Sequence, residues 1–208
     1  MISGTFRRAV FATIALLWVA VPEVRADQYS DAMRYGSACG VNRWAVKTLA
    51  DPGAAHLPAT ARSTTVAAMT RIPPPADADR LGDRVPPVET TLWHVRALLQ
   101  GYVLEEDSDI HLLLLDPQTR APMIAEIPAS YCAPKVYAAR FDAARQAVQN
   151  LGHHAARLHR IWWLDYHGTA MPLVDVWGYG FWDYEHGQRG VAPNDVELHP
   201  VMRIAPAT

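Results

Sequence analysis

Strand-like segments dominate the middle of the chain. Residues 91–104, 109–115 and 123–127 are rich in leucine, β-branched and aromatic side chains, and short polar turns separate them. In residues 109–115 both alternating faces are largely apolar, as in a strand that lies between two others. The pattern predicts a three-stranded antiparallel meander.

Further elements are predicted on both sides of the meander. Apolar residues with a period of about 3.6 predict a long helix over 134–151, with Gly152 at its C-terminal end. The other predictions are a strand over 42–49, two helical turns over 64–72 capped by Ser63 or Thr64, an extended proline-rich crossing over 73–87, and strands over 173–182 and 197–204. Gly178 and Gly180 predict a bulge or bend within residues 173–182.

This order of elements predicts a mainly β fold with one principal helix. The nearest architecture is a small, partly closed OB-like β-barrel with the helix at one end, and the alternative is an open α+β antiparallel sheet. Residues 91–208 are expected to form the barrel, with its helix near 134–151. Residues 27–90 are expected to supply the N-terminal strand and the proline-rich segment, which pack on the barrel.

Residues 1–26 have the pattern of a signal peptide. Two arginines precede an uncharged apolar run over residues 9–21, which is too short to span a bilayer comfortably. Val24 and Ala26 stand where a signal peptidase reads, so the sequence predicts cleavage after Ala26; the alternative is an uncleaved N-terminal anchor. Cleavage would make the protein exported, periplasmic or secreted, and no later stretch is apolar enough to cross a membrane.

The composition is that of a globular domain with little net charge. The 208 residues are 50% hydrophobic and 19% charged, with a formal charge of −2 at pH 7. Removing residues 1–26 takes three arginines from 19 basic residues and one glutamate from 21 acidic residues, which leaves 16 and 20 and a charge of −4. This negative net charge argues against a nucleic acid that binds over much of the protein surface.

Cys39 and Cys132 are the only cysteines. An oxidising compartment favours joining them in a disulfide. The bond would close a loop of about 90 residues, for which lost chain entropy contributes roughly 4 kcal/mol. Two free thiols, or a metal-binding pair, are the alternatives.

The C-terminal part of the chain carries a specific motif. From Asp183 it reads DYEHGQRGVAPNDVELHPV, and Gly-x-Gly-aromatic-aromatic precedes it. With the upstream blocks 43–48, 107–111, 123–128 and Cys132, it resembles a family of exported bacterial proteins of unknown function. The resemblance spans most of the chain after residue 26 and implies no activity; the order of meander and helix is similar to staphylococcal-nuclease-like barrels at the level of fold alone.

Acidic and histidine side chains around the meander form a candidate metal site. They are Asp107, Asp109, His111 and Glu126. Residues at alternate positions share one strand face, and a carboxylate from a neighbouring strand can complete the ligand set of a divalent metal. The alternative is a pair of turn acids with a histidine and a glutamate that are hydrogen-bonded at the rim of the barrel.

A second candidate site lies in and beside the loop after residue 182. Its glycines and prolines exclude a helix. The candidate catalytic residues are His186, Asp183 and His199, because histidine is the natural general base near neutral pH. The candidate ligand-binding residues are Gln188, Asn194, Trp182 and Tyr184. The alternative is a loop that closes the barrel through its own hydrogen bonds.

These observations support two functions of different classes. The first is a non-catalytic module that binds a small ligand, a glycan or a protein. The second is a metal-dependent hydrolase, a phosphodiesterase or nuclease-like enzyme, with the acidic rim and His186 around a divalent metal, the one cofactor that the sequence implies. The sequence has no serine nucleophile elbow and no phosphate-binding glycine loop. The hydrolase requires its candidate side chains to converge within a few ångströms.

Overall fold

The computed structural model describes residues 39, 42–76, 82–152, 155–158, 160–164, 170–183 and 187–208. The predicted signal peptide lies outside these residues. In the part of the chain that is described, no helix combines the length and the hydrophobicity needed to span a bilayer.

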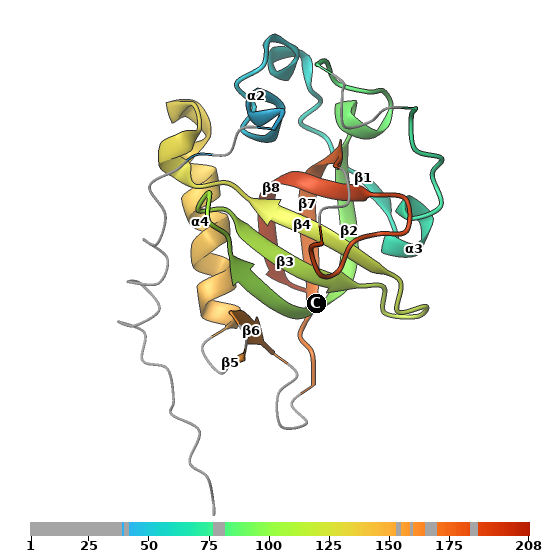
Figure 1. Cartoon of the computed structure of the whole chain (residues 1–208), viewed down its shortest axis with the longest axis vertical. Helices are drawn as coiled ribbons and strands as arrows, with labels where there is room; N and C mark the ends of the chain where they lie inside the picture. Colours follow the sequence, from blue (N-terminus) through green and yellow to red (C-terminus); the bar gives the residue numbers. More distant parts are fainter. Residues whose placement is uncertain are drawn as a thin grey trace, which may run out of the picture.

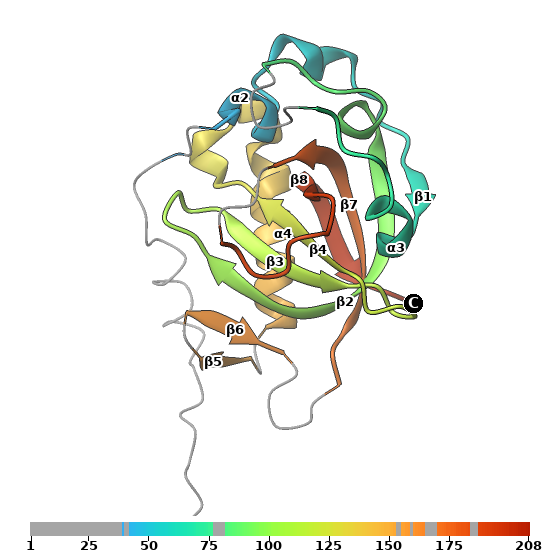
Figure 2. The same ribbon diagram turned by 45° about the vertical axis from the view of Figure 1, so that its right-hand side comes forward.

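Five strands form a closed barrel (Figures 1 and 2). They are β2 (Leu92–Leu104), β3 (Ile110–Leu115), β4 (Pro122–Ile127), β7 (Leu173–Trp182) and β8 (Val196–Pro206). Their order is β3-β4-β8-β7-β2, and pairing of β2 with β3 closes the ring. The predicted meander is confirmed, and the fold is consistent with a small OB-like barrel. The open-sheet alternative is wrong because β2 pairs with β7 over Leu92–Leu98 and with β3 over Leu98–Leu104, which closes the ring.

One seam of the barrel differs from the others. β4 and β8 run parallel and pair only at Ile124↔Glu197 and Ala125↔Leu198, whereas the other barrel pairs are antiparallel.

The register of β7 against β8 shifts at Gly178 and Gly180, as the two glycines predict. A Cβ atom on Gly180 would lie 2.5 Å from the backbone oxygen of Val88, so a larger residue cannot occupy this bend without movement of the backbone.

Helix α4 (Lys135–Leu151) packs against the barrel and confirms the predicted long helix (Figure 1). Phe141, Ala144 and Val148 of the predicted stripe are buried, and Gly152 stands at the C-cap. Between α4 and β7, the short strands β5 (Ala156–Leu158) and β6 (Ile161–Trp163) extend the sheet beside β2. The sequence pattern did not predict these two strands because each has only three residues.

The N-terminal prediction of a strand over 42–49 is wrong. Residues Trp44–Lys47 form one helical turn, α2, and Arg43 and Leu49 on either side have positive φ angles of 48° and 62°. Val46 and Leu49 are buried three positions apart, which is helical spacing, so the apparent alternation of apolar residues was misleading.

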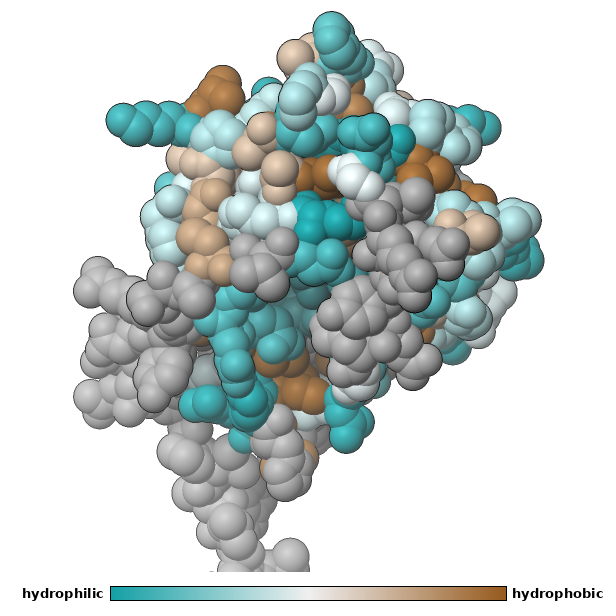
Figure 3. Space-filling view, turned by 45° about the horizontal axis from the view of Figure 1, so that its top comes forward, coloured by the Kyte–Doolittle hydropathy of each residue, from teal (hydrophilic) through white to brown (hydrophobic). Residues whose placement is uncertain are grey.

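The remaining elements are short. They are η1 (Pro52–His56), β1 (Arg62–Thr64), α3 (Val66–Met69), η3 (Val88–Thr90) and η4 (Ser130–Cys132). The helix predicted over 64–72 is therefore shorter, and its cap is Thr65, whose Oγ1 accepts a hydrogen bond from Ala68 N, because Ser63 and Thr64 belong to β1. Seen from the end that carries α2, the described surface is mostly hydrophilic, with small separate apolar patches (Figure 3).

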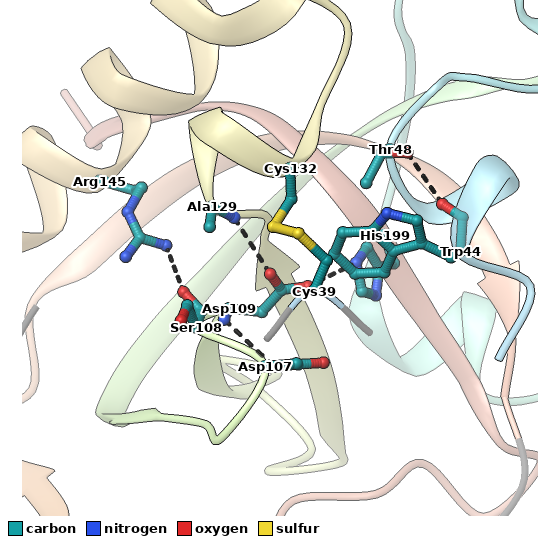
Figure 4. The surroundings of a disulfide bond; sticks show 10 residues. All are labelled: Cys39, Trp44, Thr48, Asp107, Ser108, Asp109, Ala129, Cys132, Arg145 and His199. Carbon is teal, nitrogen blue, oxygen red and sulfur yellow. Dashed lines mark hydrogen bonds and ion pairs between the residues drawn. A yellow bond between two sulfur atoms is a disulfide. The ribbon is translucent and has the colours of Figure 1, made fainter. Parts of the chain in front are cut away.

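The predicted disulfide between Cys39 and Cys132 is present (Figure 4). It joins the segment before α2 to η4, just before α4, across a sequence separation of 93 residues. The bond therefore attaches the N-terminal segment to the barrel at the point where α4 begins.

Candidate functional site

Charged side chains meet in a buried group beside the disulfide (Figure 4), on the face of β3, β4 and β8 that is turned away from the main core. We call this group the His199 cluster; its members are Lys47, Asp109, His111, Glu126, Asp183, Glu197 and His199. Asp109 and His111 share one face at the start of β3, and Glu197 and His199 share one face at the start of β8, because strand residues two apart point the same way. The carboxylates and histidines of the cluster are at most 6% exposed.

His199 is the centre of the cluster. Its Nδ1 lies 3.0 Å from Glu126 Oε2 and 3.1 Å from Glu197 Oε1. Its Nε2 lies 3.3 Å from Asp109 Oδ2. One imidazole therefore faces three carboxylates that come from beside β3, from β4 and from β8.

His111 is held as a charged ring by acceptors on both sides. Its Nδ1 lies 2.9 Å from Glu126 Oε1, and its Nε2 lies 3.0 Å from the backbone oxygen of Arg189. Since both nitrogens face acceptors, both carry protons. Burial is the largest single influence and opposes this charge, but the hydrogen bond and charge of Glu126, the Arg189 backbone oxygen and the charge of Glu105 together raise the pKa of His111.

Lys47 supplies a third positive charge. Its Nζ lies 3.3 Å from Asp183 Oδ2 and 4.9 Å from the ring centroid of Phe181. Burial alone would lower the pKa of Lys47, but the negative charges of Glu197, Glu126 and Asp183 raise it. The one-turn helix α2 therefore brings a cation to the barrel end, a role that the predicted strand did not suggest.

The carboxylates of the cluster differ in their proton affinity. Burial raises the pKa of Asp109 and, together with the neighbouring charge of Glu126, that of Glu197. Glu126 is also buried, yet hydrogen bonds from His111 and His199 hold its pKa well below the ordinary value. Burial by itself would lower the pKa of His199, but the three carboxylates around it, from Asp109, Glu126 and Glu197, raise it well above the usual value.

The structure brings together part of each predicted site. Asp109, His111 and Glu126 converge, and the catalytic candidates Asp183 and His199 join them. Asp107 does not reach His199; its Oδ1 accepts a hydrogen bond from Asp109 N within the turn. The predictions for His186 and Tyr184 lie outside the described residues. Lys47 and Glu197 were missed, although Glu197 and His199 repeat the alternate spacing of Asp109 and His111.

Two of the proposed ligand-binding side chains point into the protein. Trp182 is 2% exposed and belongs to the core. Asn194 is buried, and its Nδ2 donates hydrogen bonds to the backbone oxygens of Met69 at 3.0 Å and Ile72 at 2.8 Å. Gln188 lines a pocket of about 10 Å³ with Asp183 and Glu197, which has room for one water molecule.

Replacement of Asn194 by alanine is expected to lower the free energy of unfolding by about 1–3 kcal/mol. The reason is that the side chain ties the β7–β8 loop to the segment after α3, and its loss leaves buried backbone oxygens without their donor. Urea denaturation of the wild type and the variant measures the change. Asn150→Ala, on the exposed side of α4, is the control, and an Asn194→Ala variant as stable as this control would contradict the role.

A separate groove lies on the outside of the barrel, between α4 and strands β7 and β8. Its volume is about 750 Å³, within the usual range of small-molecule sites, roughly 300–1,000 Å³. Its lining consists of Ala59, Ala61, Leu92, Ala139, Arg140, Ala143, Ala144, Trp177, Met202, Arg203 and Ile204. The described lining is therefore apolar apart from two arginines, and it includes no acidic residue.

Neighbouring strands fix the position of Trp177 in this groove. His94 on β2, Trp177 on β7 and Arg203 on β8 are paired across the sheet. The His94 ring stacks on Trp177 with 4.6 Å between centroids and 10° between planes, and the Arg203 guanidinium carbon lies 4.4 Å from the Trp177 ring centroid. His94 is held in turn by Asp175, 3.0 Å from its Nε2. These contacts hold Trp177 and Arg203 in place along one side of the groove.

Comparisons with known proteins identify no family. No family model matches the chain, and no curated protein matches it. Among solved structures, a protein described as an aspartyl-tRNA synthetase from Leishmania major Friedlin is similar over 73% of this chain and 21% of that chain, with 13% identity and a TM-score of 0.35. The matched part is about a fifth of that protein, and a likeness at this level carries no functional argument.

Proposed function

We propose that this protein is an exported, disulfide-tied barrel that binds a small anionic molecule with an apolar body in the groove between α4 and strands β7 and β8. The observation that carries the proposal is the pair of arginines, Arg140 and Arg203, in an otherwise apolar groove. Guanidinium groups offer only hydrogen-bond donors, and they pair with carboxylate, sulfonate or phosphate groups.

The chemistry of the lining favours this class over a glycan. Sugar hydroxyls need acceptors as well as donors, and the described side chains of the groove provide no carboxylate or amide oxygen. The export part of the proposal is supported by the N-terminal sequence pattern and by the disulfide, which is typical of oxidising compartments. The burial of the His199 cluster gives a hydrolase mechanism no support, because a polymeric substrate cannot reach side chains that are at most 6% exposed.

The test uses 8-anilinonaphthalene-1-sulfonate, an aryl sulfonate, and its uncharged analogue N-phenyl-1-naphthylamine. We expect the sulfonate to bind and the double variant Arg140→Gln/Arg203→Gln to weaken its binding about tenfold or more, since hydrogen bonds to charged groups contribute roughly 1.5–3 kcal/mol. Binding of the uncharged analogue should change little. Fluorescence titration measures both.

Arg157→Gln is the matched control for the double variant. Arg157 also lies over a tryptophan, 5.5 Å from the ring centroid of Trp162, but it is outside the groove. Equal sulfonate affinity in the double variant and in Arg157→Gln would overturn the proposal, and so would the absence of sulfonate binding to the wild type.

A further inference from the structure

Two buried polar atoms in the His199 cluster have no hydrogen-bond partner among the described residues. They are Asp109 Oδ2 and His199 Nε2, both in side chains with no exposed surface. The two atoms face each other at 3.3 Å, but without the alignment of a hydrogen bond. The other oxygen of Asp109 is fixed, because Ala129 N donates to Oδ1 at 3.0 Å (Figure 4). Apart from this ion-pair contact the two buried atoms have no hydrogen bond, which is costly at this depth, so they point to a missing ligand.

The separation of the two atoms fits a bound metal ion. Zinc binds nitrogen and oxygen ligands at about 2.0–2.1 Å in a tetrahedron, whose ligand–ligand edge is then about 3.3 Å. Asp109 Oδ2 and His199 Nε2 are at that separation. Glu126 offers a second carboxylate as the third ligand, and one ligand atom from each of the three residues lies within 4.8 Å of the others.

The second nitrogen of His199 has the environment that metal-binding histidines require. Its Nδ1 faces Glu197 Oε1 at 3.1 Å, and this contact keeps the proton on Nδ1 and the lone pair on Nε2 when Glu126, which lies 3.0 Å from Nδ1 in this structure, ligates the ion. A carboxylate on the far nitrogen fixes the tautomer and strengthens the ring as a ligand. His111 has no such free nitrogen, because Glu126 and the Arg189 backbone occupy both of its ring nitrogens.

The charge of the cluster also matches a divalent cation. Four carboxylates are present, from Asp109, Glu126, Asp183 and Glu197, and the fixed positive charges are Lys47 and His111. With a neutral His199, two negative charges are left uncompensated, and a divalent ion neutralises them. With a protonated His199, one negative charge is left in the buried cluster, which is unfavourable at low dielectric.

We propose that Asp109, Glu126 and His199 bind a divalent cation of the zinc type within the buried His199 cluster, as a structural site. Binding replaces the proton on His199 Nε2, and that proton is released to solvent. The ion links the start of β3, the end of β4 and the start of β8. It therefore reinforces the parallel β4–β8 seam, which has only two paired positions. The site is independent of the groove, because the two share no residue.

Elemental analysis of the full chain, purified from a periplasmic fraction in chelator-free buffer, tests the proposal. We expect about one divalent metal ion per chain. Removal by 1,10-phenanthroline should lower the melting temperature by roughly 5 °C or more, and Zn²⁺ should restore it. Addition of Zn²⁺ to the stripped protein should release about one proton per chain.

The variants His199→Gln and Asp109→Asn should lose the metal, and their melting temperatures should no longer respond to the chelator. His111→Gln, in the same cluster, is the matched control and should keep the metal.

If the two ligand variants do not fold, the visible absorption of Co²⁺ added to the stripped wild-type protein tests the site, since tetrahedral nitrogen and oxygen ligation gives a distinct spectrum. A wild-type protein that contains no metal and does not respond to Zn²⁺ has only an ion-pair network here, which overturns the proposal. Metal retained in both ligand variants also overturns it.

Discussion

Replacement of Glu89 by alanine is expected to lower the free energy of unfolding by about 3–5 kcal/mol, as is typical when one partner of a buried ion pair is removed. Glu89 has no exposed surface, and its two oxygens accept from both terminal nitrogens of Arg43 at 2.7 Å. The same oxygens accept from Val85 N at 2.8 Å and from Trp182 N at 2.9 Å. The substitution therefore leaves a buried guanidinium and two backbone donors without their acceptor.

Urea denaturation measures the loss of stability, and two further variants test whether it comes from the buried ion pair. Glu106→Gln is the matched control: Glu106 is 88% exposed and 3.8 Å from Arg160, so its loss should change the free energy of unfolding by less than about 1 kcal/mol. The double variant Arg43→Met/Glu89→Leu should be more stable than Glu89→Ala, because it removes both buried charges together. A Glu89→Ala variant as stable as Glu106→Gln would show that this pair does not hold α2 against the end of β7.

Replacement of both Cys39 and Cys132 by serine is expected to lower the free energy of unfolding by about 4–5 kcal/mol. The bond spans 93 positions, and the chain-entropy cost of leaving a loop of that length open is of this order. Figure 4 shows the disulfide beside Asp109 and His199, so its loss should also increase the exposure of the His199 cluster to solvent. Urea denaturation of the oxidised wild type and of the double variant measures the difference.

The disulfide prediction has an internal control. A reductant should lower the stability of the wild type to that of the double-serine variant and should leave the variant unchanged. Intact mass of the exported wild type should be two hydrogens below that of the reduced chain. Reaction of the native, unreduced protein with two equivalents of a thiol reagent would contradict the bond.

Local periodicity was enough to predict the elements that are long. The meander over β2, β3 and β4, helix α4 and strands β7 and β8 all repeat their pattern over several residues, and all are present. The segment at 42–49 was misassigned because one helical turn and a short strand bury similar numbers of side chains. The positive φ angles of Arg43 and Leu49 and the backbone hydrogen bonds from Val46 N and Lys47 N to the Arg43 oxygen separate the two.

The role of Glu89 could not be predicted from the sequence. Nothing in the run PPVETT distinguishes this glutamate from a solvated turn residue. Its role follows from Arg43, 46 positions earlier, and Trp182, 93 positions later, which the fold brings to the same place. Lys47 is a similar case, because its partner Asp183 is 136 positions away.

Sequence alone determined which side chains share a face. Alternation placed Asp109 with His111 and has the same form for Glu197 and His199, and two cysteines after a predicted signal peptide predicted their own pairing. Tertiary structure decided which faces are inside. Strand alternation has the same form whether a face is solvated or covered, and only closure of β2 onto both β3 and β7 makes one face the interior of a barrel. The His199 cluster lies on the other face, and it is buried because α2 and the β7–β8 loop cover it, with Lys47 against Asp183 and the Arg189 backbone against His111. Burial of this kind depends on contacts between residues far apart in the chain, whereas periodicity depends only on near neighbours.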